Sequence, residues 1–135
     1  MIKETDIGLI IQKLIERLDP CLIYMFGSAA RGEMTGESDV DIAFLCDCSP
    51  DEYEIYVIAQ EIACMLDREV DLVNLERAST VLQAQVVSTG KVIYCKHQGK
   101  RMIYEMNVLK DYARLNEERK PIIEKVKERG SVYGK

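Results

Sequence analysis

Short apolar runs that favour β-strands alternate with longer amphipathic runs of helical spacing, and this alternation most constrains the fold. Strands are predicted over 22–26, 39–45, 69–75 and 91–95. Helices are predicted over 4–18, 49–67, 78–88 and 100–129. The order helix–strand–strand–helix–strand–helix–strand–helix predicts an α/β fold, in which helices pack on a small β-sheet of mixed strand direction.

Local signals predict where these helices begin and end. The first helix ends before Pro20, because the residue that precedes a proline avoids the helical region. Ser49 is predicted as the N-cap of the second helix, with Pro50 at its first position. Gly90 is predicted to close the third helix, and Pro121 to kink the last helix or to start a new one.

Length and composition indicate one ordinary domain. A chain of 135 residues fits a single core, and we expect residues 1–98 to form it, with residues 99–135 as a helical extension of the same domain. The hydrophobic fraction of 47% and the charged fraction of 30% are typical of globular proteins. No apolar run approaches the roughly 20 residues that span a bilayer, and no signal segment opens the chain. We therefore expect a cytoplasmic protein.

Charge is distributed unevenly along the chain. Residues 1–95 contain 7 Lys+Arg and 17 Asp+Glu, whereas residues 96–135 contain 11 and 6, and the net charge of the whole is −5. A basic C-terminal region indicates an acidic protein partner, nucleic acid or simply a solvated helix face. The acidic remainder argues against direct nucleic-acid binding by a broad surface, because phosphate contacts dominate such affinity.

The cysteines and the histidine exclude some kinds of site. Five cysteines are spread through apolar segments without a CxxC pair, and we expect them to be buried free thiols. Cys46 and Cys48 alone do not supply the four ligands of a structural zinc site. His97 is the only histidine, and we expect it to be solvated. A single histidine is too few for a histidine-rich metal cluster, and it gives little basis for a histidine-based catalytic triad.

A glycine–serine turn lies ten residues before two acids that are one residue apart. The pairs are Gly27-Ser28 and Asp39-x-Asp41. Gly27 lets the main chain approach a phosphate without a Cβ in the way, and Ser28 can donate its hydroxyl. A helical turn that follows can aim its N-terminus at the same anion. Arg31 either meets a phosphate oxygen or pairs with a carboxylate, and both interpretations stay open.

The acids indicate a metal site. Strand alternation places Asp39 and Asp41 on one face, with Val40 directed into the core. Adjacent carboxylates repel one another unless cations lie between them, and Mg²⁺ prefers oxygen ligands. Asp71 is predicted as a third carboxylate, because an acid in an apolar strand is costly without a cation nearby. Glu69 is the alternative on the same face. Two such metals can hold the attacking and leaving oxygens of a phosphoryl displacement.

These residues carry a family resemblance. The pattern Gly27-Ser28-x10-Asp39-x-Asp41, with Arg31-Gly32 and Ser38 in between, resembles the nucleotidyltransferase superfamily of DNA polymerase beta. The small size and the segment 26–32 are similar to the minimal nucleotidyltransferases, the MntA-like antitoxins encoded beside HEPN ribonuclease toxins. The resemblance covers about residues 20–95 and implies a polymerase-beta-like nucleotidyltransferase fold.

The resemblance also implies an activity. It implies transfer of AMP from ATP, with two Mg²⁺ ions, onto a tyrosine of the HEPN toxin, and hence a possible hetero-oligomer with that toxin. By position, Asp39 and Asp41 would bind both metals. Asp71 would bind the catalytic metal and help to deprotonate the attacking hydroxyl. The nucleotide-binding residues implied by position are Gly27 and Ser28, at the β- and γ-phosphates, with Arg31 and Ser38.

We expect no acceptor-binding domain in a chain of this length, and therefore expect the acceptor to be brought by a partner or to bind a small cleft. Two alternatives stay open: a non-catalytic antitoxin that acts by binding alone, and a small-molecule nucleotidyltransferase of the aminoglycoside type. The basic C-terminal helix is a candidate partner surface. The other interpretation of its apolar residues is that they pack on the sheet; these are Met102, Met106, Leu109 and Tyr112.

Overall fold

The computed structural model describes residues 4–27 and 39–128, with side chains described up to residue 117. The helices are α1 (Glu4–Leu18), α2 (Glu52–Leu66), α3 (Thr80–Thr89) and α4 (Gln98–Glu128), with a 3-10 turn η1 (Leu75–Arg77). The strands are β1 (Leu22–Phe26), β2 (Val40–Leu45), β3 (Val70–Asn74) and β4 (Lys91–Cys95). The predicted order of elements is confirmed, and η1 is added between β3 and α3.

The four strands form one sheet in the order β3-β2-β1-β4. β1 pairs antiparallel with both β2 and β4, whereas β2 and β3 run parallel. The predicted mixed direction is therefore confirmed. β2 and β3 are parallel and are connected through α2, so both begin at the same end of the sheet. Residues near the start of both strands are thereby brought together, although about 30 residues of chain separate them.

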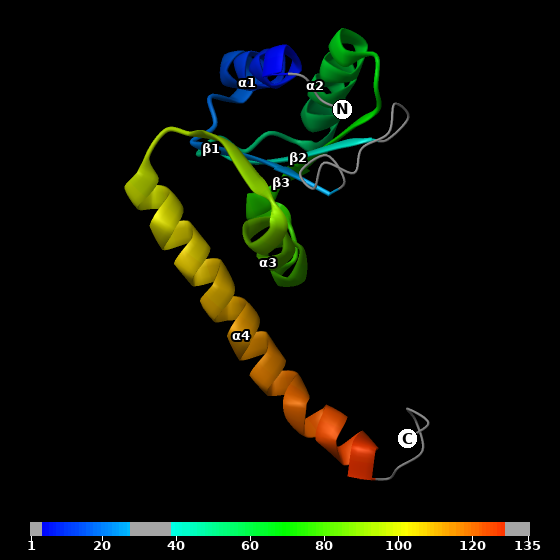
Figure 1. Ribbon diagram of the computed structural model, residues 1–135, viewed down its shortest axis with the longest axis vertical. Coiled ribbons are helices and arrows are strands. Elements are labelled where there is room, and N and C mark those ends of the chain that lie inside the picture. The colour runs from blue at the N-terminus through cyan, green and yellow to red at the C-terminus, as the bar shows by residue number, and fades with distance from the viewer. Residues whose placement is uncertain (1–3, 28–38, 129–135) are drawn as a thin grey trace.

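Each face of the sheet is covered by a pair of helices (Figure 1). α1 and α2 cover one face, where Ile10, Leu14, Ile58 and Ile62 pack against alternate residues of β1 and β2. α3 and α4 lie on the other face, where Tyr24 and its neighbours form a second cluster. The strand residues that face α1 and α2 are Ile23, Val40, Ile42 and Phe44. The intervening residues of β2, among them Asp41, therefore point to the side of α3 and α4.

One helix start differs from its prediction. The N-cap of α2 is Asp51, whose carboxylate accepts a hydrogen bond from the Glu54 amide at 2.7 Å. The prediction of Ser49 as N-cap was wrong, because Asp51 caps equally well and leaves Pro50 buried just before the helix. Gly90 closes α3 as predicted, with its amide donating to the Val86 carbonyl at 2.8 Å.

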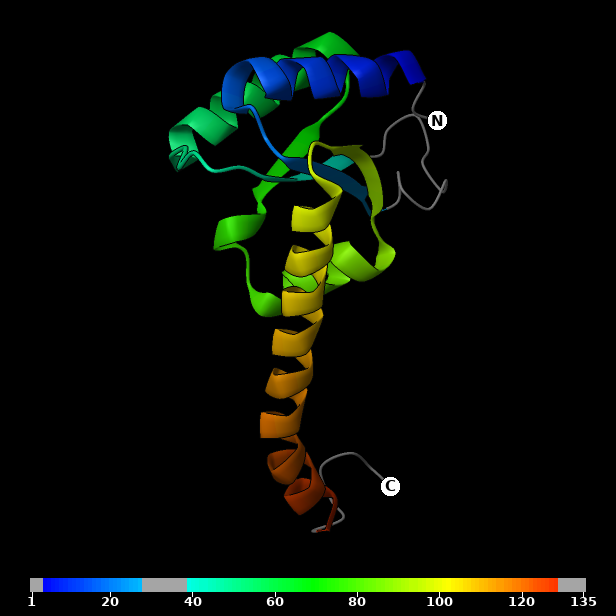
Figure 2. The same ribbon diagram turned by 90° about the vertical axis from the view of Figure 1, so that its left-hand side faces the viewer.

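α4 is a single helix that continues through Pro121, so no new helix starts there, and the alternative of a kink at Pro121 stays a prediction. Its first half is fixed to the body by polar contacts from its inner face. The Tyr24 hydroxyl donates to Glu105 Oε2 at 2.5 Å, and the Tyr104 hydroxyl donates to Gln83 Oε1 at 2.9 Å. Arg101 Nε also donates to Glu105 Oε2, at 3.2 Å. Figure 2 shows the rest of the helix extending beyond the sheet and α3.

The outer face of α4 corrects another expectation. Met102, Met106 and Leu109 are exposed, so the interpretation that they pack on the sheet was wrong, while Tyr112 is half-buried. Among the side chains described on α4, those of Tyr104, Glu105 and Val108 lie on the face that meets the body.

The cysteines are free thiols, as predicted, but only Cys46 is buried. His97 is exposed, as expected, in the turn between β4 and α4. None of the helices in the described ranges is long and apolar enough to cross a membrane.

Candidate active site

The register of the strands brings the predicted acids to one end of the sheet, where β2 and β3 begin. Asp41 of β2 lies opposite Phe26, the last residue of β1, and directly beside Asp71 of β3. Residues paired in register point to the same face of a sheet, so the Asp41 and Asp71 carboxylates are neighbours. Asp39 lies just before β2 and is exposed. Alternation places it on the same side as Asp41. Three carboxylates therefore gather where β2 and β3 begin.

Gly27 is held against this acid pair. Its φ of +72° lies in the left-handed region, which side chains rarely adopt. A Cβ at position 27 would overlap the Asp41 carboxylate. A glycine is thus needed here for two reasons: the backbone turns sharply at the end of β1, and Asp41 occupies the space beside it. The prediction of glycine for the approach of phosphate is separate from both of these reasons.

The electrostatics of Asp41 reflect its two acidic neighbours. The pKa of Asp41 is raised above its ordinary value, first by burial and then by the charges of Asp71 and Asp39. Burial disfavours the charged form, and each neighbouring carboxylate adds repulsion. Perturbed ionisable groups of this kind are typical of functional sites.

The donor set fits a hard divalent cation. Carboxylate oxygens are the ligands that Mg²⁺ prefers, and a cation would relieve the repulsion at Asp41. Within the described ranges, no three His, Cys, Asp or Glu side chains are already arranged around one point as a metal site. Asp39 and Asp71 are both exposed, so their side chains can change rotamer toward Asp41. The residues that would hold the ion are these three aspartates.

The environment of Asp71 differs from the prediction. The cost of an acid in an apolar strand assumes burial, whereas the Asp71 side chain is exposed. β3 is an edge strand, and one side of it has no neighbouring strand. Its place beside Asp41 supports Asp71 as a site residue better than burial does, because the register puts it there directly. Glu69 is also exposed and lies outside β3.

Three predicted nucleotide-binding residues lie outside the described residues: Ser28, Arg31 and Ser38. Their assignment stays a prediction, as do the roles assigned to Gly27 and to the aspartates.

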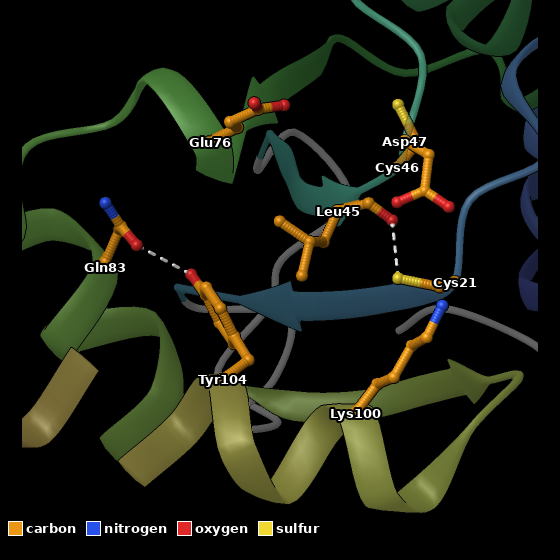
Figure 3. Close-up of a pocket in the computed structure, with 8 residues that line it drawn as sticks. All are labelled: Cys21, Leu45, Cys46, Asp47, Glu76, Gln83, Lys100 and Tyr104. Carbon is orange, nitrogen blue, oxygen red and sulfur yellow. Dashed lines mark hydrogen bonds between the residues drawn. The ribbon is translucent and has the colours of Figure 1, made fainter. Parts of the chain in front are cut away.

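A separate pocket of about 550 Å³ opens at the other end of β1 (Figure 3). Leu45, which pairs with the first residue of β1, lies on its wall. Its other lining residues are Cys21, Cys46, Asp47, Glu76, Gln83, Lys100 and Tyr104. The pocket is therefore distinct from the acid cluster, which lies where β1 ends.

Comparison with known proteins identifies the class. The family model for the polymerase beta nucleotidyltransferase domain matches residues 9–99. This match contains both strands that carry the acids, together with the glycine turn. The chain belongs to the polymerase beta nucleotidyltransferase family, and it is a nucleotidyltransferase.

Individual proteins show which members of the family this chain resembles. The chain is 40% identical over 105 residues to the protein adenylyltransferase MntA of Shewanella oneidensis, covering 78% of this chain and 75% of that protein. It is similar to a chain in the crystal structure of a toxin–antitoxin with AMP-PNP, with a TM-score of 0.82 and 37% identity. The superposition covers 89% of this chain and 97% of the other.

A third similarity involves a modified protein. A chain in the complex of tri-AMPylated Shewanella oneidensis HEPN toxin with MNT antitoxin superposes with a TM-score of 0.79 and 34% identity. The match covers 93% of this chain and 98% of the other. The similarity therefore extends well beyond the family domain and includes much of α4.

Proposed function

We propose that this protein is a Mg²⁺-dependent adenylyltransferase that transfers AMP from ATP to a tyrosine hydroxyl of a cognate HEPN ribonuclease toxin. The modification would neutralise the toxin, which makes this chain the antitoxin. One observation carries the proposal: Asp41 and Asp71 are register neighbours beside Gly27, and Asp39 adds a third charge. The relatives support this acceptor, since they include an adenylyltransferase and a chain from a complex that contains an AMPylated HEPN toxin. Because ATP is a cellular metabolite, we expect the reaction in the cytoplasm.

The proposed reaction is an in-line displacement at the α-phosphorus of ATP. The tyrosine oxygen forms a bond to that phosphorus, the bond to the bridging oxygen of the β-phosphate breaks, and pyrophosphate leaves. The hydroxyl proton passes to a carboxylate, and Asp71 is the exposed acid beside Asp41 that can accept it. Bound Mg²⁺ would neutralise phosphate charge and stabilise the attacking and leaving oxygens.

The three aspartates and the glycine have different tasks in this scheme. Asp39 and Asp41 would hold the cations that accompany the triphosphate, because they lie one residue apart at the start of β2 and on the same side. Gly27 leaves the space beside Asp41 free of a side chain, so that main chain, carboxylate and phosphate can approach closely. The predicted contacts of Ser28, Arg31 and Ser38 would complete the phosphate site.

Radiolabelled ATP tests this proposal directly. The full chain is incubated with the HEPN protein that the proposal takes as acceptor, labelled ATP and Mg²⁺, and label on the HEPN protein is measured. We expect transfer by the wild type and none by the Asp39→Ala/Asp41→Ala variant. Asp47→Ala is the matched control, because Asp47 is an exposed acid just beyond the other end of β2. Transfer that persists in the double variant would contradict the metal-site assignment.

The same variants separate the competing functions. If the Asp39→Ala/Asp41→Ala variant protects cells from the toxin as well as the wild type does, the chain acts by binding alone. If a small molecule is labelled without any HEPN protein, the acceptor assignment is wrong. Thermal stabilisation by each nucleoside triphosphate with Mg²⁺ measures nucleotide preference, and we expect the largest shift with ATP.

A further inference from the structure

The outer face of α4 carries an exposed apolar stripe. Met102 is 63% exposed, Met106 69% and Leu109 45%, and Ala113 is exposed one turn further on. Successive residues of a helix are about 100° apart, so spacings of four, three and four residues place all four side chains on one line. Ile103, 62% exposed, lies at the edge of this line. We call residues 102, 106, 109 and 113 the α4 stripe.

The α4 stripe is not a loosely packed core face. The core face of the same helix is occupied separately: Val108 is buried, Tyr104 bonds Gln83, and Glu105 accepts from Tyr24. These contacts fix the rotation of the helix about its axis. They leave the α4 stripe directed away from α3 and the sheet, where no described residue covers it. Contiguous exposed apolar surface of this kind marks interaction sites.

The pattern fits another helix. Apolar residues that alternate at spacings of four and three form the seam of paired helices, where side chains of one helix insert between those of the other. Methionine adapts its shape to a partner surface, and two of the four residues are methionines. The exposed bases Lys110 and Arg114 lie on the border nearest Ile103. The charge of residues 96–135 is basic, in contrast to the acidic remainder of the chain.

Charge complementarity therefore selects the partner. A helix that pairs with the α4 stripe is favoured when its own apolar seam is bordered by aspartates or glutamates that face Lys110 and Arg114. A second copy of this chain would instead present another α4, which is the most basic part of the molecule. A phospholipid surface would attract the bases, but it would be repelled by the acidic remainder of the chain.

α4 starts near the opposite end of β1 from the acid cluster. The Lys96 amide bonds the Cys21 carbonyl, just before β1, whereas Asp41 lies opposite Phe26 at the end of β1. The two are separated by the length of β1, roughly 13 Å for four residue steps. A protein bound along the α4 stripe therefore leaves the acid cluster open to a tyrosine on another of its segments.

We propose that the α4 stripe is the docking site for the protein acceptor, which binds through an amphipathic surface helix with acidic borders. This inference rests on the proposed function, because it presumes a protein acceptor. Docking raises the effective concentration of the acceptor tyrosine near the nucleotide, without any contact between the stripe and the reacting atoms. The arrangement separates recognition of the acceptor from transfer.

A charge placed in the α4 stripe tests the proposal. In the full chain, Met102→Glu/Met106→Glu introduces two carboxylates into the seam. The matched control is Tyr53→Glu/Tyr56→Glu, because these tyrosines are 75% and 61% exposed on α2, on the opposite side of the sheet. The probe is the same purified HEPN protein that serves as acceptor in the transfer assay. Affinity is measured by calorimetry, and label transfer from ATP is measured in parallel.

We expect Met102→Glu/Met106→Glu to weaken binding of the HEPN protein on the order of 100-fold and to lower kcat/KM for it, while the control changes neither. Thermal stabilisation by ATP with Mg²⁺ should stay at the wild-type value in both, which shows that the fold and the nucleotide site are intact. Equal affinity in the stripe variant and the control would overturn the proposal.

Other occupants are outcomes of the same experiment. A wild-type dimer in light scattering that becomes monomeric in Met102→Glu/Met106→Glu would assign the α4 stripe to a second copy and overturn the proposal. Binding to vesicles of anionic phospholipid that is lost in this variant would likewise overturn it. Failure of the proposed function looks different: Asp39→Ala/Asp41→Ala would retain transfer, while the stripe variant would still lose affinity for the HEPN protein.

Discussion

Two neighbouring places on one face of the sheet have opposite electrostatics. Polar groups are hydrogen-bonded at the first, and like charges repel one another at the second. At Tyr24, in the middle of β1, the hydroxyl donates to Glu105, and Arg101 donates to the same carboxylate. Phe26 lies two residues further along β1, and Asp41 of β2 lies opposite it. The charges of Asp71 and Asp39 act on Asp41 there. The first arrangement stabilises the fold. The second destabilises it unless a cation binds, so structural anchoring and chemistry occupy neighbouring positions with opposite electrostatics.

The largest effect is expected from removing the charge at the second position. Asp41→Asn should lower the rate of AMP transfer by on the order of 10²–10³-fold, because a ligand of the triphosphate–metal site is lost. The same change should raise the melting temperature at neutral pH, since it removes a half-buried charge that two acids repel. Transfer assays and calorimetry measure the two effects on one preparation.

The gain in stability should depend on pH. A raised carboxyl pKa means that the folded state holds its proton more tightly than the unfolded state does, so this group lowers stability as pH rises. The penalty begins near the unfolded pKa of about 3.9 and is complete above the folded pKa. The stabilisation by Asp41→Asn should therefore disappear in acid. A gain that is equal at acidic and neutral pH would contradict this account of the acid cluster.

The next effect concerns the glycine that faces Asp41. Gly27→Ala should destabilise the protein by about 1–3 kcal/mol, because it combines a left-handed φ of +72° with a Cβ that overlaps the carboxylate. Nucleotide binding should weaken as well. Gly8→Ala is the control, since Gly8 lies in α1 with open space around it, and it should stabilise by about 0.5–1 kcal/mol. Urea denaturation of both variants measures the contrast.

A smaller effect is expected at the satisfied position. Tyr24→Phe removes the donor to Glu105 and should cost about 1–2 kcal/mol of unfolding free energy. The loss should be limited because Arg101 still donates to the same carboxylate. Tyr53→Phe, at a 75% exposed tyrosine, should change stability by less than about 0.5 kcal/mol. If Tyr24→Phe were as neutral as this control, Tyr24 would not anchor α4.

The smallest effect is expected on the rates at which cysteines are modified, and not on stability. Burial, then the hydrogen bond with Cys48, raise the pKa of Cys46 to about 12, and its Sγ lies 2.8 Å from that of Cys48. Because the thiolate is the reactive form, iodoacetamide should modify exposed Cys64 at least about tenfold faster than Cys46 near neutral pH. Mass spectrometry after timed quenching gives both rates, and the difference should vanish in denaturant.

Much of the acid cluster could be predicted from the sequence. Asp39 and Asp41 share a face because strands have a period of two, and an apolar run around Asp71 indicates a third strand. Sequence alone does not give the register, because α2 intervenes between β2 and β3 and its packing sets how the strands align. It also does not reveal that β3 is an edge strand, which is why Asp71 is exposed.

The C-terminal helix shows a second limit. Helical periodicity marks apolar residues on α4, but two apolar faces exist on this helix, one through Tyr104 and Val108 and the other through Met102 and Met106. Which of them meets the body depends on long-range partners such as Tyr24 and Gln83. Those partners lie far away in the chain, so spacing alone could not choose between the two faces.

Parallel pairing of β2 and β3 has a consequence for how this enzyme tolerates change. Both strands begin at the end of the sheet where Asp41 and Asp71 lie, and the chain between the strands returns through α2. The acid pair depends on where the two strands start, and α2 contributes no residue to it. Insertions or deletions of whole turns in α2 should therefore preserve the spacing of the acids. By contrast, a shift of one residue in β3 would turn Asp71 to the opposite face of the sheet.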